Sequence, residues 1–461
     1  MIIINVTDTV VKNNMCIGCG VCASLCPTNA LKIDFNQDGE YNSKLTGDCF
    51  DSCSLCLDIC PFNNNKNEDQ LAENIFSNDL KYDSNLGFYL NTYSAHNNND
   101  QLRLNSASGG ITTWLLEQLL FEDKVDYIIN VKPNEDSEKL FDFQIADSAE
   151  KIRKGAGSAY YPVEMSEVIN KVLNQEGRYA IVALPCFLKA IELAKEKDKK
   201  LRNRIIYSVG LVCGQLKNKN FTEYISKLAG MKDKINEVSY RNNSGDQPAN
   251  NYYYYFNNNN KNSQIYWRDG ISKAWTNRWF AYNACSFCDD AFAELADITL
   301  MDAWLPEFTS DYKGNNLLVV RNKEIDDILL SGKNNDEIKL DNIDAEKVIK
   351  SQQGVIDIKG KNLSYRLALA EENDGFTPNK RVEASKNINF FSKKEVEYKD
   401  KMQEESKKEW NKLKNDAISF DEFEAEIYGI LNRLYYWRKF KKLIFLPKRV
   451  IRKVHKINNK L

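Results

Sequence analysis

Twelve cysteines carry the clearest chemistry in this 461-residue sequence, and eight of them fall within one short stretch near its start. In the first run, three thiols stand two residues apart and are followed by a fourth thiol and a proline. A second run repeats this order, with its last three cysteines and its proline at one constant offset. The eight residues are Cys16, Cys19, Cys22, Cys26, Cys49, Cys53, Cys56 and Cys60. This spacing is typical of bacterial ferredoxins, where a short loop brings three thiolates to one iron–sulfur cubane while the fourth reaches the next.

The crossed arrangement of such modules predicts which thiols share a cluster. The first [4Fe-4S] cluster is expected on Cys16, Cys19, Cys22 and Cys60. The second is expected on Cys49, Cys53, Cys56 and Cys26, with one residue inserted in the loop after Cys49. A zinc site or disulfide bonds are the alternative, but structural zinc sites use two separated pairs of ligands. Eight thiols at this spacing therefore favour two clusters.

Four further cysteines lie at three places in the following domain. Cys186 and Cys213 each follow an apolar run that is expected to be a buried strand, and Cys285 and Cys288 form a pair spaced by two residues. Open α/β sheets place their chemistry at the carboxyl ends of parallel strands. A free cysteine is also often only a small buried apolar side chain. Because one pair and two strand-end thiols make a complete set of four, we favour a third [4Fe-4S] cluster.

Two loops of small residues could take an anionic ligand. The first, 106–110, contains Ser108, Gly109 and Gly110 and precedes an apolar segment that is expected to be a helix over 111–121. Small residues at a helix start leave backbone N–H groups open to a phosphate or a flavin pyrophosphate. Serine with glycine is also a common structural cap, so both interpretations stay open. The second loop contains Gly157 and Ser158 and leads into an expected helix over 164–173.

The elements that must position these residues alternate between strands and helices. Continuous apolar runs at 179–184 and 204–212 are typical of parallel strands buried on both faces. Short aromatic strands at 237–241, 252–256 and 264–267 are expected to pair antiparallel. The predicted fold is an α+β ferredoxin-like 2[4Fe-4S] module at 1–62, a polar linker at 63–86, an α/β domain with a mixed sheet at 87–360, and a helical basic extension at 361–461.

Composition argues against several classes of function. The net charge of −2 gives no general attraction for nucleic acid. Metal-binding thiolates need a reducing compartment, and the sequence shows neither a signal peptide nor an apolar run of membrane-spanning length, so a cytoplasmic location is expected. The chain contains only two histidines, which argues against histidine-based acid–base catalysis.

The last part of the chain is strongly basic. No Asp or Glu follows Glu426, and eleven Lys or Arg residues lie from Arg433 onward, interleaved with aromatic and aliphatic residues. This composition is typical of a helix that lies on an anionic membrane, so residues 433–461 predict a peripheral membrane contact. Pro447 should break that helix into two pieces. A tail that packs on its own domain or on a partner is the alternative.

The order and spacing of motifs across residues 14–325 resemble those of a known family, the beta subunits of coenzyme F420-reducing hydrogenases and dehydrogenases. The motifs are Ser108-Gly109-Gly110, Gly157-Ser158-Ala-Tyr160, Leu184-Pro185-Cys186, Val212-Cys213-Gly214, Ser239-Tyr240-Arg241, Cys285-x-x-Cys288 and Asp297-Ile-Thr-Leu-Met-Asp302-Ala-Trp304. The family's usual glycine-threonine-proline-cysteine-glutamine run is here Ala183 to Phe187, and Met301 replaces a glycine. These changes lie where flavin or substrate is expected, so the resemblance does not carry a substrate over.

The resemblance implies a flavoprotein with FAD in the central domain and a cubane cluster beside it, which fits the four remaining cysteines. It implies Ser108, Gly109, Gly110, Gly157, Ser158 and Arg241 as FAD-binding residues, and Asp302 and Tyr160 as candidate catalytic groups. The family includes subunits that act on coenzyme F420, ferredoxin-dependent enzymes such as 7-hydroxymethyl chlorophyll a reductase, and members encoded among polysaccharide-synthesis genes.

Two hypotheses follow. The first is an iron–sulfur flavoprotein oxidoreductase that passes electrons from ferredoxin or a similar carrier through [4Fe-4S] clusters to FAD and on to an organic substrate. The family's gene association points to polysaccharide biosynthesis for that substrate. The second is an electron-transfer subunit of a larger redox complex, or an F420-dependent oxidoreductase.

Overall fold

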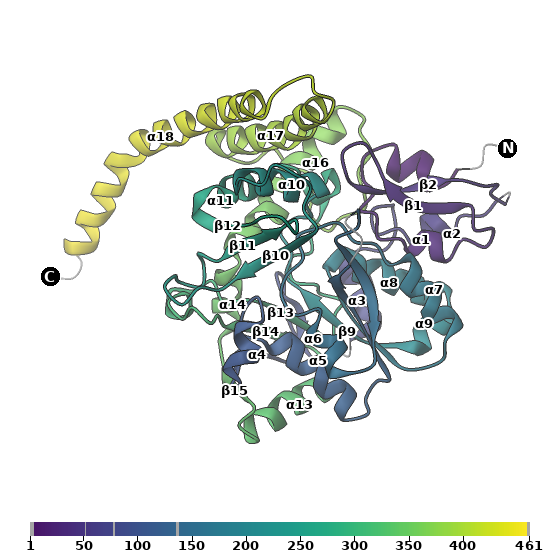
Figure 1. The fold of residues 1–461 in the computed structure, drawn as a ribbon. Helices are drawn as coiled ribbons and strands as arrows, with labels where there is room; N and C mark the ends of the chain where they lie inside the picture. Colours follow the sequence, from purple (N-terminus) through teal and green to yellow (C-terminus); the bar gives the residue numbers. More distant parts are fainter. Residues whose placement is uncertain (1–3, 51, 77–78, 135–137, 459–461) are drawn as a thin grey trace.

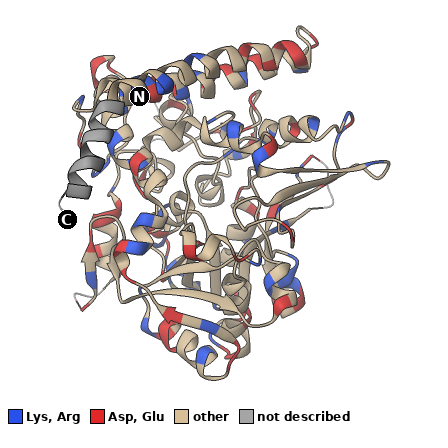
Figure 2. Ribbon diagram, turned by 90° about the vertical axis from the view of Figure 1, so that its left-hand side faces the viewer, with Lys and Arg blue, Asp and Glu red and all other residues tan. Residues whose placement is uncertain are grey.

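The computed structural model describes residues 4–50, 52–76, 79–134 and 138–458, with side chains up to residue 445 in the last helix. Figure 1 shows a small N-terminal module packed against a central α/β body, and a pair of long C-terminal helices along the top of the view, next to that module. Acidic and basic residues are interspersed over these elements (Figure 2), as the small net charge leads one to expect.

The N-terminal module is a two-stranded hairpin with short helices around the cysteine loops. Strands β1 (Leu31–Phe35) and β2 (Tyr41–Leu45) pair antiparallel. Gly39 has a φ of 73° in the turn between them, which glycine adopts without strain. The helical turns are η1 (Thr7–Val11), α1 (Val21–Ser24) and α2 (Leu55–Asp58).

The stretch 63–86, predicted to be a polar linker, contains regular structure. Helix α3 (Glu68–Ile75) begins with a capping box in which the side chains of Asn67 and Gln70 each accept the other's backbone N–H. Its Leu71 and Ala72 pack into the core around the cysteine loops. Strand β3 (Lys81–Asp83) then pairs with β4 (Gly87–Tyr89). The prediction is wrong here because a polar composition concealed both the cap and the apolar face of the helix.

An eight-stranded mixed sheet forms the centre of the body, in the order β15-β5-β14-β13-β9-β8-β6-β7. Strands β13, β9, β8 and β6 run parallel, and the strands on both sides of them pair antiparallel. The bounds are β5 (Asn91–Asn97), β6 (Tyr127–Pro133), β7 (Phe141–Ala146), β8 (Tyr179–Ala183), β9 (Ile205–Leu211), β13 (Ile298–Asp302), β14 (Asn316–Val320) and β15 (Ile338–Asn342). The predicted mixed sheet is confirmed, as are its buried parallel strands β8 and β9.

Helices bury both faces of the sheet, because successive strand residues point to opposite sides. Ile129 and Ile181 pack with α7 (Ser166–Asn174) and α8 (Pro185–Lys197) and with the N-terminal module. Ile128 and Ala180 belong to the core on the other face, built with α5 and α13. The other helices around the sheet are α4 (Asp100–Leu104), α5 (Ile111–Phe121), α6 (Ala149–Arg153), α9 (Lys199–Arg204), α12 (Pro306–Thr309) and α13 (Lys323–Asn334).

A smaller aromatic sheet stands beside the main one. Strands β10 (Glu237–Asn242), β11 (Tyr253–Asn257) and β12 (Asn262–Tyr266) pair antiparallel, as predicted. They share a core with α10 (Lys219–Leu228) and with the two long C-terminal helices, α17 (Phe390–Lys414) and α18 (Phe420–Asn458). The short helical turns η2 (Trp267–Asp269), α11 (Ile271–Thr276) and η3 (Asn283–Phe287) follow β12 and return the chain to the main sheet.

The C-terminal part begins with α14 (Ala345–Ser351), α15 (Gln353–Asp357), the π-helical turn η4 (Ile358–Asn362) and α16 (Leu363–Glu372). An irregular segment, residues 373–389, which we call the strap, leads to α17 (Phe390–Lys414) and α18 (Phe420–Asn458). The predicted break at Pro447 is wrong, because α18 continues through it. Within the described residues, no helix combines the length and apolar character needed to cross a membrane.

Candidate functional site

Four ferredoxin-type thiols face one small cavity in the N-terminal module. The cysteines that line it are Cys16, Cys19, Cys22 and Cys60, the four predicted to share the first cluster. Cys60 and Cys16 lie close enough to Cys19 that a charge on either would raise the pKa of the Cys19 thiol further, beyond the effect of burial. Burial raises the pKa values of Cys19 and Cys60 far above the ordinary range. Thiolates are therefore unfavourable here unless a bound metal compensates them, and metal coordination removes the thiol proton outright.

The second thiol set lies nearer the surface. Cys26, Cys49, Cys53 and Cys56 lie close together. A charge on Cys26 or Cys53 would raise the pKa of Cys49, and a charge on any of the other three would raise the pKa of Cys56. The structure thus brings Cys26 to the second run, as the crossed pattern predicts. All four of these thiols are only partly buried. In the first set, by comparison, Cys19 and Cys22 are buried.

The remaining four cysteines converge, although they come from distant parts of the chain. Cys186 lies in the first turn of α8, Cys213 follows β9, and Cys285 and Cys288 lie in and directly after η3. Cys186 lies close enough to the other three that a charge on any of them would raise its pKa. Burial raises the pKa of Cys213 to about 12. We call these four the core thiols. Across the described ranges, no three His, Cys, Asp or Glu side chains are arranged to hold a single metal ion.

A buried lysine that the sequence did not single out belongs to the core thiols. Lys359, in the π-helical turn η4, is 4% exposed, and its Nζ lies 2.8 Å from the Cys288 Sγ. Its charge also acts on Cys213 and Cys285. Nothing in the local sequence Ile-Lys-Gly-Lys distinguishes Lys359 from the exposed Lys361 two residues later. Only the tertiary packing of η4 could reveal this contact.

Tyr282 connects the first thiol set to the core thiols. Its side chain is 2% exposed, and its hydroxyl accepts the Tyr41 backbone N–H at 2.9 Å. The charges of Cys16 and Cys285 both act on this hydroxyl. The chain therefore arranges its thiols in series: the partly exposed second set, the first set with its two buried thiols, Tyr282, and then the core thiols.

A cavity of about 750 Å³ opens beside the core thiols, and Cys213 forms part of its wall. The loops 106–110 and 155–158 and the first turn of α5 line part of the wall. Aromatic side chains line much of the rest, namely Tyr160, Tyr240, Tyr252, Trp267, Trp275 and Trp304. Cofactor and ligand cavities usually measure about 300–1,000 Å³ and combine apolar walls with a few fixed polar groups. This cavity has the size and the lining of such a site.

Arg241 and Asp302, both predicted site residues, form an ion pair in the cavity wall. The Arg241 guanidinium lies over the rings of Tyr252 and Trp304, at 4.6 and 5.2 Å from their centroids. Its Nη2 donates to the Ala107 carbonyl at 3.1 Å, while its Nε is buried without a hydrogen-bond partner among the described residues. Leaving a buried donor unpaired is costly, so this group fits an acceptor oxygen supplied by a ligand.

The predicted glycines have different roles. Gly157 has a φ of 106°, and a Cβ added there would meet nothing within 4 Å, so this loop leaves room for a ligand. Gly110, with a φ of 80°, is the residue before α5 and also lines the cavity. Gly109 is not among the lining residues. A Cβ on Gly109 would lie 2.8 Å from the Ala95 carbonyl oxygen, so close packing against β5 requires this glycine.

The predicted serines and Tyr160 also line the cavity. The Ser108 hydroxyl donates to the Asn315 carbonyl at 2.7 Å, which supports the structural interpretation of that side chain. Ser158 forms a backbone bridge with Tyr240. The Tyr160 ring packs edge-on against Trp275 at 4.6 Å, and burial raises the pKa of Tyr160. Its hydroxyl therefore stays protonated at neutral pH and can act as a hydrogen-bond donor.

Lys217 is a further cavity residue that sequence reasoning missed. Its side chain is 2% exposed, and its Nζ donates to the Trp279 carbonyl at 2.6 Å. Its ammonium lies over the rings of Phe221 and Trp275. Burial lowers the pKa of Lys217 well below the ordinary range. No motif surrounds this lysine, so only the fold places it in the wall.

Comparison with known families decides the assignment. The family of beta subunits of "Coenzyme F420 hydrogenase/dehydrogenase" matches by its N-terminal region over residues 92–170 and by its C-terminal region over 176–346. A "4Fe-4S dicluster domain" matches residues 15–64. The chain belongs to the family of coenzyme F420 hydrogenase/dehydrogenase beta subunits. It is accordingly a member of an oxidoreductase family and carries an iron–sulfur domain.

Individual relatives are remote. The chain is 22% identical over 211 residues to one of the subunits of the F(420)H(2) dehydrogenase of Methanosarcina mazei, covering 44% of this chain and 54% of that protein. It is 21% identical over 389 residues to "Coenzyme F420-dependent sulfite reductase" of Methanocaldococcus jannaschii, covering 80% of this chain and 53% of that protein. The chain thus spans about half the length of the curated relatives it matches.

One solved structure superposes in part. It is a chain of the F420-reducing [NiFe] hydrogenase complex from Methanosarcina barkeri, with a TM-score of 0.49 at 17% identity, covering 66% of this chain and 99% of that chain. The segments of this protein that match the family of coenzyme F420 hydrogenase beta subunits end at residue 346. The turn η4 with Lys359, the strap and the helices α17 and α18 therefore lie outside them.

Proposed function

We propose that this family member is an iron–sulfur flavoprotein oxidoreductase that receives electrons from ferredoxin or a similar carrier and delivers them, through FAD, to an organic substrate. The observation that carries the proposal is the position of the core thiols. Cys186, Cys213, Cys285 and Cys288 meet at one end of the thiol series, and Cys213 lies in the wall of a cavity of about 750 Å³. A redox cofactor in that cavity would lie directly beside the last thiol set.

The cavity residues fit FAD by their chemistry. The first turn of α5 presents backbone N–H groups beside Gly110, and the loop around Gly157 leaves open space, which together suit a pyrophosphate. The unpaired Nε of Arg241 suits an acceptor oxygen, and the aromatic wall suits a flat ring system. A bound flavin supplies the exchange between one-electron carriers and two-electron chemistry. Asp302 holds Arg241 in place, and Tyr160 offers a protonated hydroxyl.

Quantifying iron and flavin in anaerobically purified protein tests this proposal. Three [4Fe-4S] clusters and one flavin correspond to about twelve irons and about one FAD per chain. EPR of the reduced protein should then show three interacting centres. Protein with about eight irons and no flavin would contradict the assignment of the core thiols and of the cavity, while leaving the ferredoxin module intact.

The second candidate is an electron-transfer subunit of a larger F420-linked complex. It is favoured by the relatives, because one is named as a subunit of an F420H2 dehydrogenase and another as an F420-dependent sulfite reductase. Reduction of F420 by the purified chain, or stable co-purification with a second redox protein, would support this candidate. Oxidation of reduced ferredoxin that depends on an added small molecule would support the first. A polysaccharide precursor as that molecule is a proposal that comes from the family resemblance.

We also propose that the distal part of α18 contacts an anionic membrane surface. Tyr436, Phe440 and Leu443 are 72%, 51% and 67% exposed and follow a spacing of four and three residues, so they lie on one face of the helix. Leu434, by contrast, is buried in the core shared with α17, and Phe440 contacts Phe391 of α17 with part of its ring while the rest stays exposed. Lys439, Lys441 and Lys442 flank it. This arrangement suits the boundary between acyl chains and acidic headgroups.

A further inference from the structure

Buried cations surround the core thiols. Lys359 donates to the Cys288 Sγ at 2.8 Å, and its charge acts on the other three core thiols. The charge of Arg278, whose side chain is 1% exposed, acts on Cys285. The Arg278 guanidinium donates to Gln403 and Ser286, which are neutral partners. The charges of Asp290 and Asp400 offset part of those of Lys359 and Arg278, respectively, so the direct contact of Lys359 with Cys288 is what distinguishes this cation.

Carboxylates, in contrast, are the charged neighbours of the ferredoxin-type thiols. The charge of Glu40 acts on Cys16, and that of Glu164 acts on Cys19. At the more exposed end of the module, the charges of Asp8 and Asp48 act on the Cys49 thiol. Glu40 is itself paired with Lys407 at 2.5 Å, which offsets part of its charge. The thiol series thus runs from an acidic environment at the module to a cationic one at the core.

The sign of this difference has a direct consequence for electron distribution. Reduction adds a negative charge to a cluster, so a nearby cation favours the reduced form and a nearby anion opposes it. Complete burial alone would oppose reduction of a centre with four thiolates, because a low dielectric disfavours added charge. The contact of Lys359 with Cys288 counteracts this effect at the core thiols.

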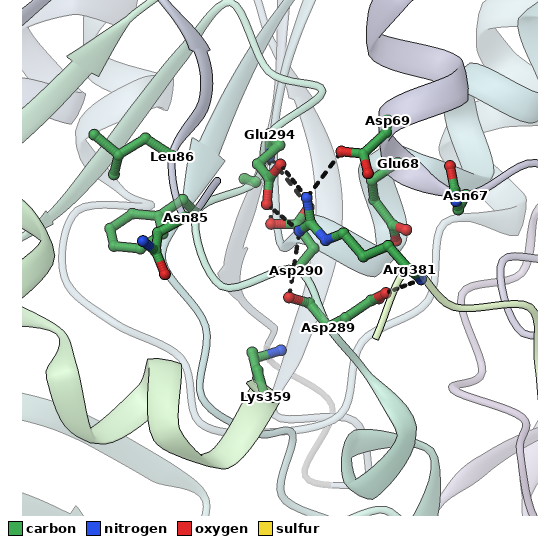
Figure 3. Close-up of polar contacts among 12 residues, drawn as sticks. Asn67, Glu68, Asp69, Asn85, Leu86, Asp289, Asp290, Glu294, Lys359 and Arg381 are labelled. Carbon is green, nitrogen blue, oxygen red and sulfur yellow. Dashed lines mark hydrogen bonds and ion pairs between the residues drawn. The ribbon is translucent and has the colours of Figure 1, made fainter. Parts of the chain in front are cut away.

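We propose that the charge of Lys359 raises the reduction potential of a cluster on the core thiols. This potential then lies above the potentials of the two clusters in the ferredoxin-type module. Electrons that enter through the partly exposed second set then collect at the core, beside the cavity. This inference rests on the proposed function, and it assigns to that function an inward direction of electron flow. Figure 3 shows Lys359 on η4, apart from the ion pairs that surround Arg381.

The test is an EPR-monitored redox titration of the full-length, anaerobically prepared holoprotein. Lys359→Gln removes the charge and keeps an N–H donor on a side chain that is one bond shorter. We expect the equilibrium constant for moving an electron from the module to the core to fall about tenfold, which corresponds to about 59 mV for one electron. The potentials of the two module clusters should not change. At one electron per wild-type chain, the signal of the core cluster should dominate.

Two matched variants separate the charge from other effects of the substitution. Lys359→Arg keeps the charge and should keep the wild-type potential of the core cluster. Lys361→Gln removes an exposed charge from the same turn and should also leave that potential unchanged. An unchanged potential in Lys359→Gln, or an equal shift in all three variants, would overturn the inference.

A second variant tests the inference independently, in case the Lys359→Gln protein does not retain its core cluster. Arg278→Gln removes the other buried cation and should lower the same potential in the same direction, and an unchanged value there would also contradict the inference. Wild-type protein with about eight irons per chain would overturn the proposed core cluster itself, and with it the role of Lys359. Twelve irons with no shift in either variant would overturn only the role of Lys359.

Discussion

At the scale of single residues, Arg241 connects the aromatic wall of the cavity to its polar side. The guanidinium stacks on Tyr252 and Trp304, pairs with Asp302 and retains one unpaired buried N–H. We expect Arg241→Gln to weaken flavin binding about 10- to 100-fold, because a hydrogen bond to a charged group contributes about 1.5–3 kcal/mol. Flavin per chain and a fluorescence titration with FAD measure this effect.

Iron content is the internal control for that variant, because the contacts of Arg241 are with the cavity wall and not with the thiols. Arg241→Lys keeps the charge but lacks the planar fork that reaches Asp302 and Ala107 together, so its flavin affinity should fall between those of wild type and Arg241→Gln. Equal flavin content in all three proteins would show that the ligand of the cavity does not use this side chain.

A second residue, Glu294, makes a specific prediction for pH dependence. Its carboxyl group is buried and contacts Arg381, with Asp290 and Arg321 beside it, and burial raises the pKa of Glu294 to about 8. The folded state therefore keeps a proton that the unfolded chain releases near its ordinary pKa of 4.5. Stability should then fall as pH rises from about 4.5 to 8, by up to about 1.4 kcal/mol per pH unit from this group.

Thermal unfolding at pH 6 and pH 8.5 measures that dependence. Glu294→Gln cannot lose a proton in this range, so its unfolding temperature should change less between the two pH values than that of wild type. Asp69→Asn removes a different contact of Arg381, which spans 3.0 Å, and should keep the wild-type slope. The same slope in Glu294→Gln as in wild type would show that another group titrates.

At the scale of elements, Arg381 fastens the strap to the rest of the protein (Figure 3). Its guanidinium contacts Asp69 of α3 at 3.0 Å and Glu294 at 2.7 Å, and its backbone N–H donates to Asp289 at 3.1 Å. Each buried hydrogen bond to a charged group contributes about 1.5–3 kcal/mol. We expect Arg381→Gln to increase hydrogen exchange in α3 and in the strap, while exchange in the main sheet stays unchanged.

Lys386→Gln is the matched control for this variant. Lys386 lies in the same strap, but its pair with Glu372 is exposed, and exposed pairs contribute about 0–1 kcal/mol. Exchange in α3 should therefore stay at the wild-type rate in Lys386→Gln. Faster exchange in both variants would indicate that the strap is held by its general packing and not by the Arg381 ion pairs.

Elements with a strong periodic or apolar signal could be predicted from the sequence. The helix over 111–121 and the buried strand over 179–183 follow from apolar runs and short flanking signals, and the structure confirms both. Helix α3 was missed because eight residues rich in Asn, Asp and Glu resemble a linker until the capping box at Asn67 is weighed. The continuity of α18 across Pro447 was missed because a local rule for proline does not weigh the length of helix on either side.

At the scale of the whole molecule, the convergence of thiols was predictable and the surroundings of the thiols were not. Cysteines are few, so Cys186, Cys213 and the Cys285–Cys288 pair could be grouped by chemistry and by their expected place at strand ends. Lysines are numerous, and nothing local marks Lys359 or Lys217 as buried. The contact of Lys359 with Cys288 joins residues 71 positions apart, so it depends on how the segment after the main sheet folds back.

The whole molecule also offers a surface test, because Figure 1 shows α18 extending away from the body that its first half covers. Replacing Lys439, Lys441 and Lys442 with Gln should weaken binding to vesicles rich in acidic lipid by about two orders of magnitude, since each lysine near such a surface contributes about 1 kcal/mol. Co-sedimentation with acidic and with neutral vesicles measures this. Replacing Lys171, Lys199 and Lys200 of α7 and α9 removes the same charge elsewhere and should have little effect. Equal binding of both triple variants, or capture of the intact tail by a protein partner but not by acidic vesicles, would contradict a membrane contact.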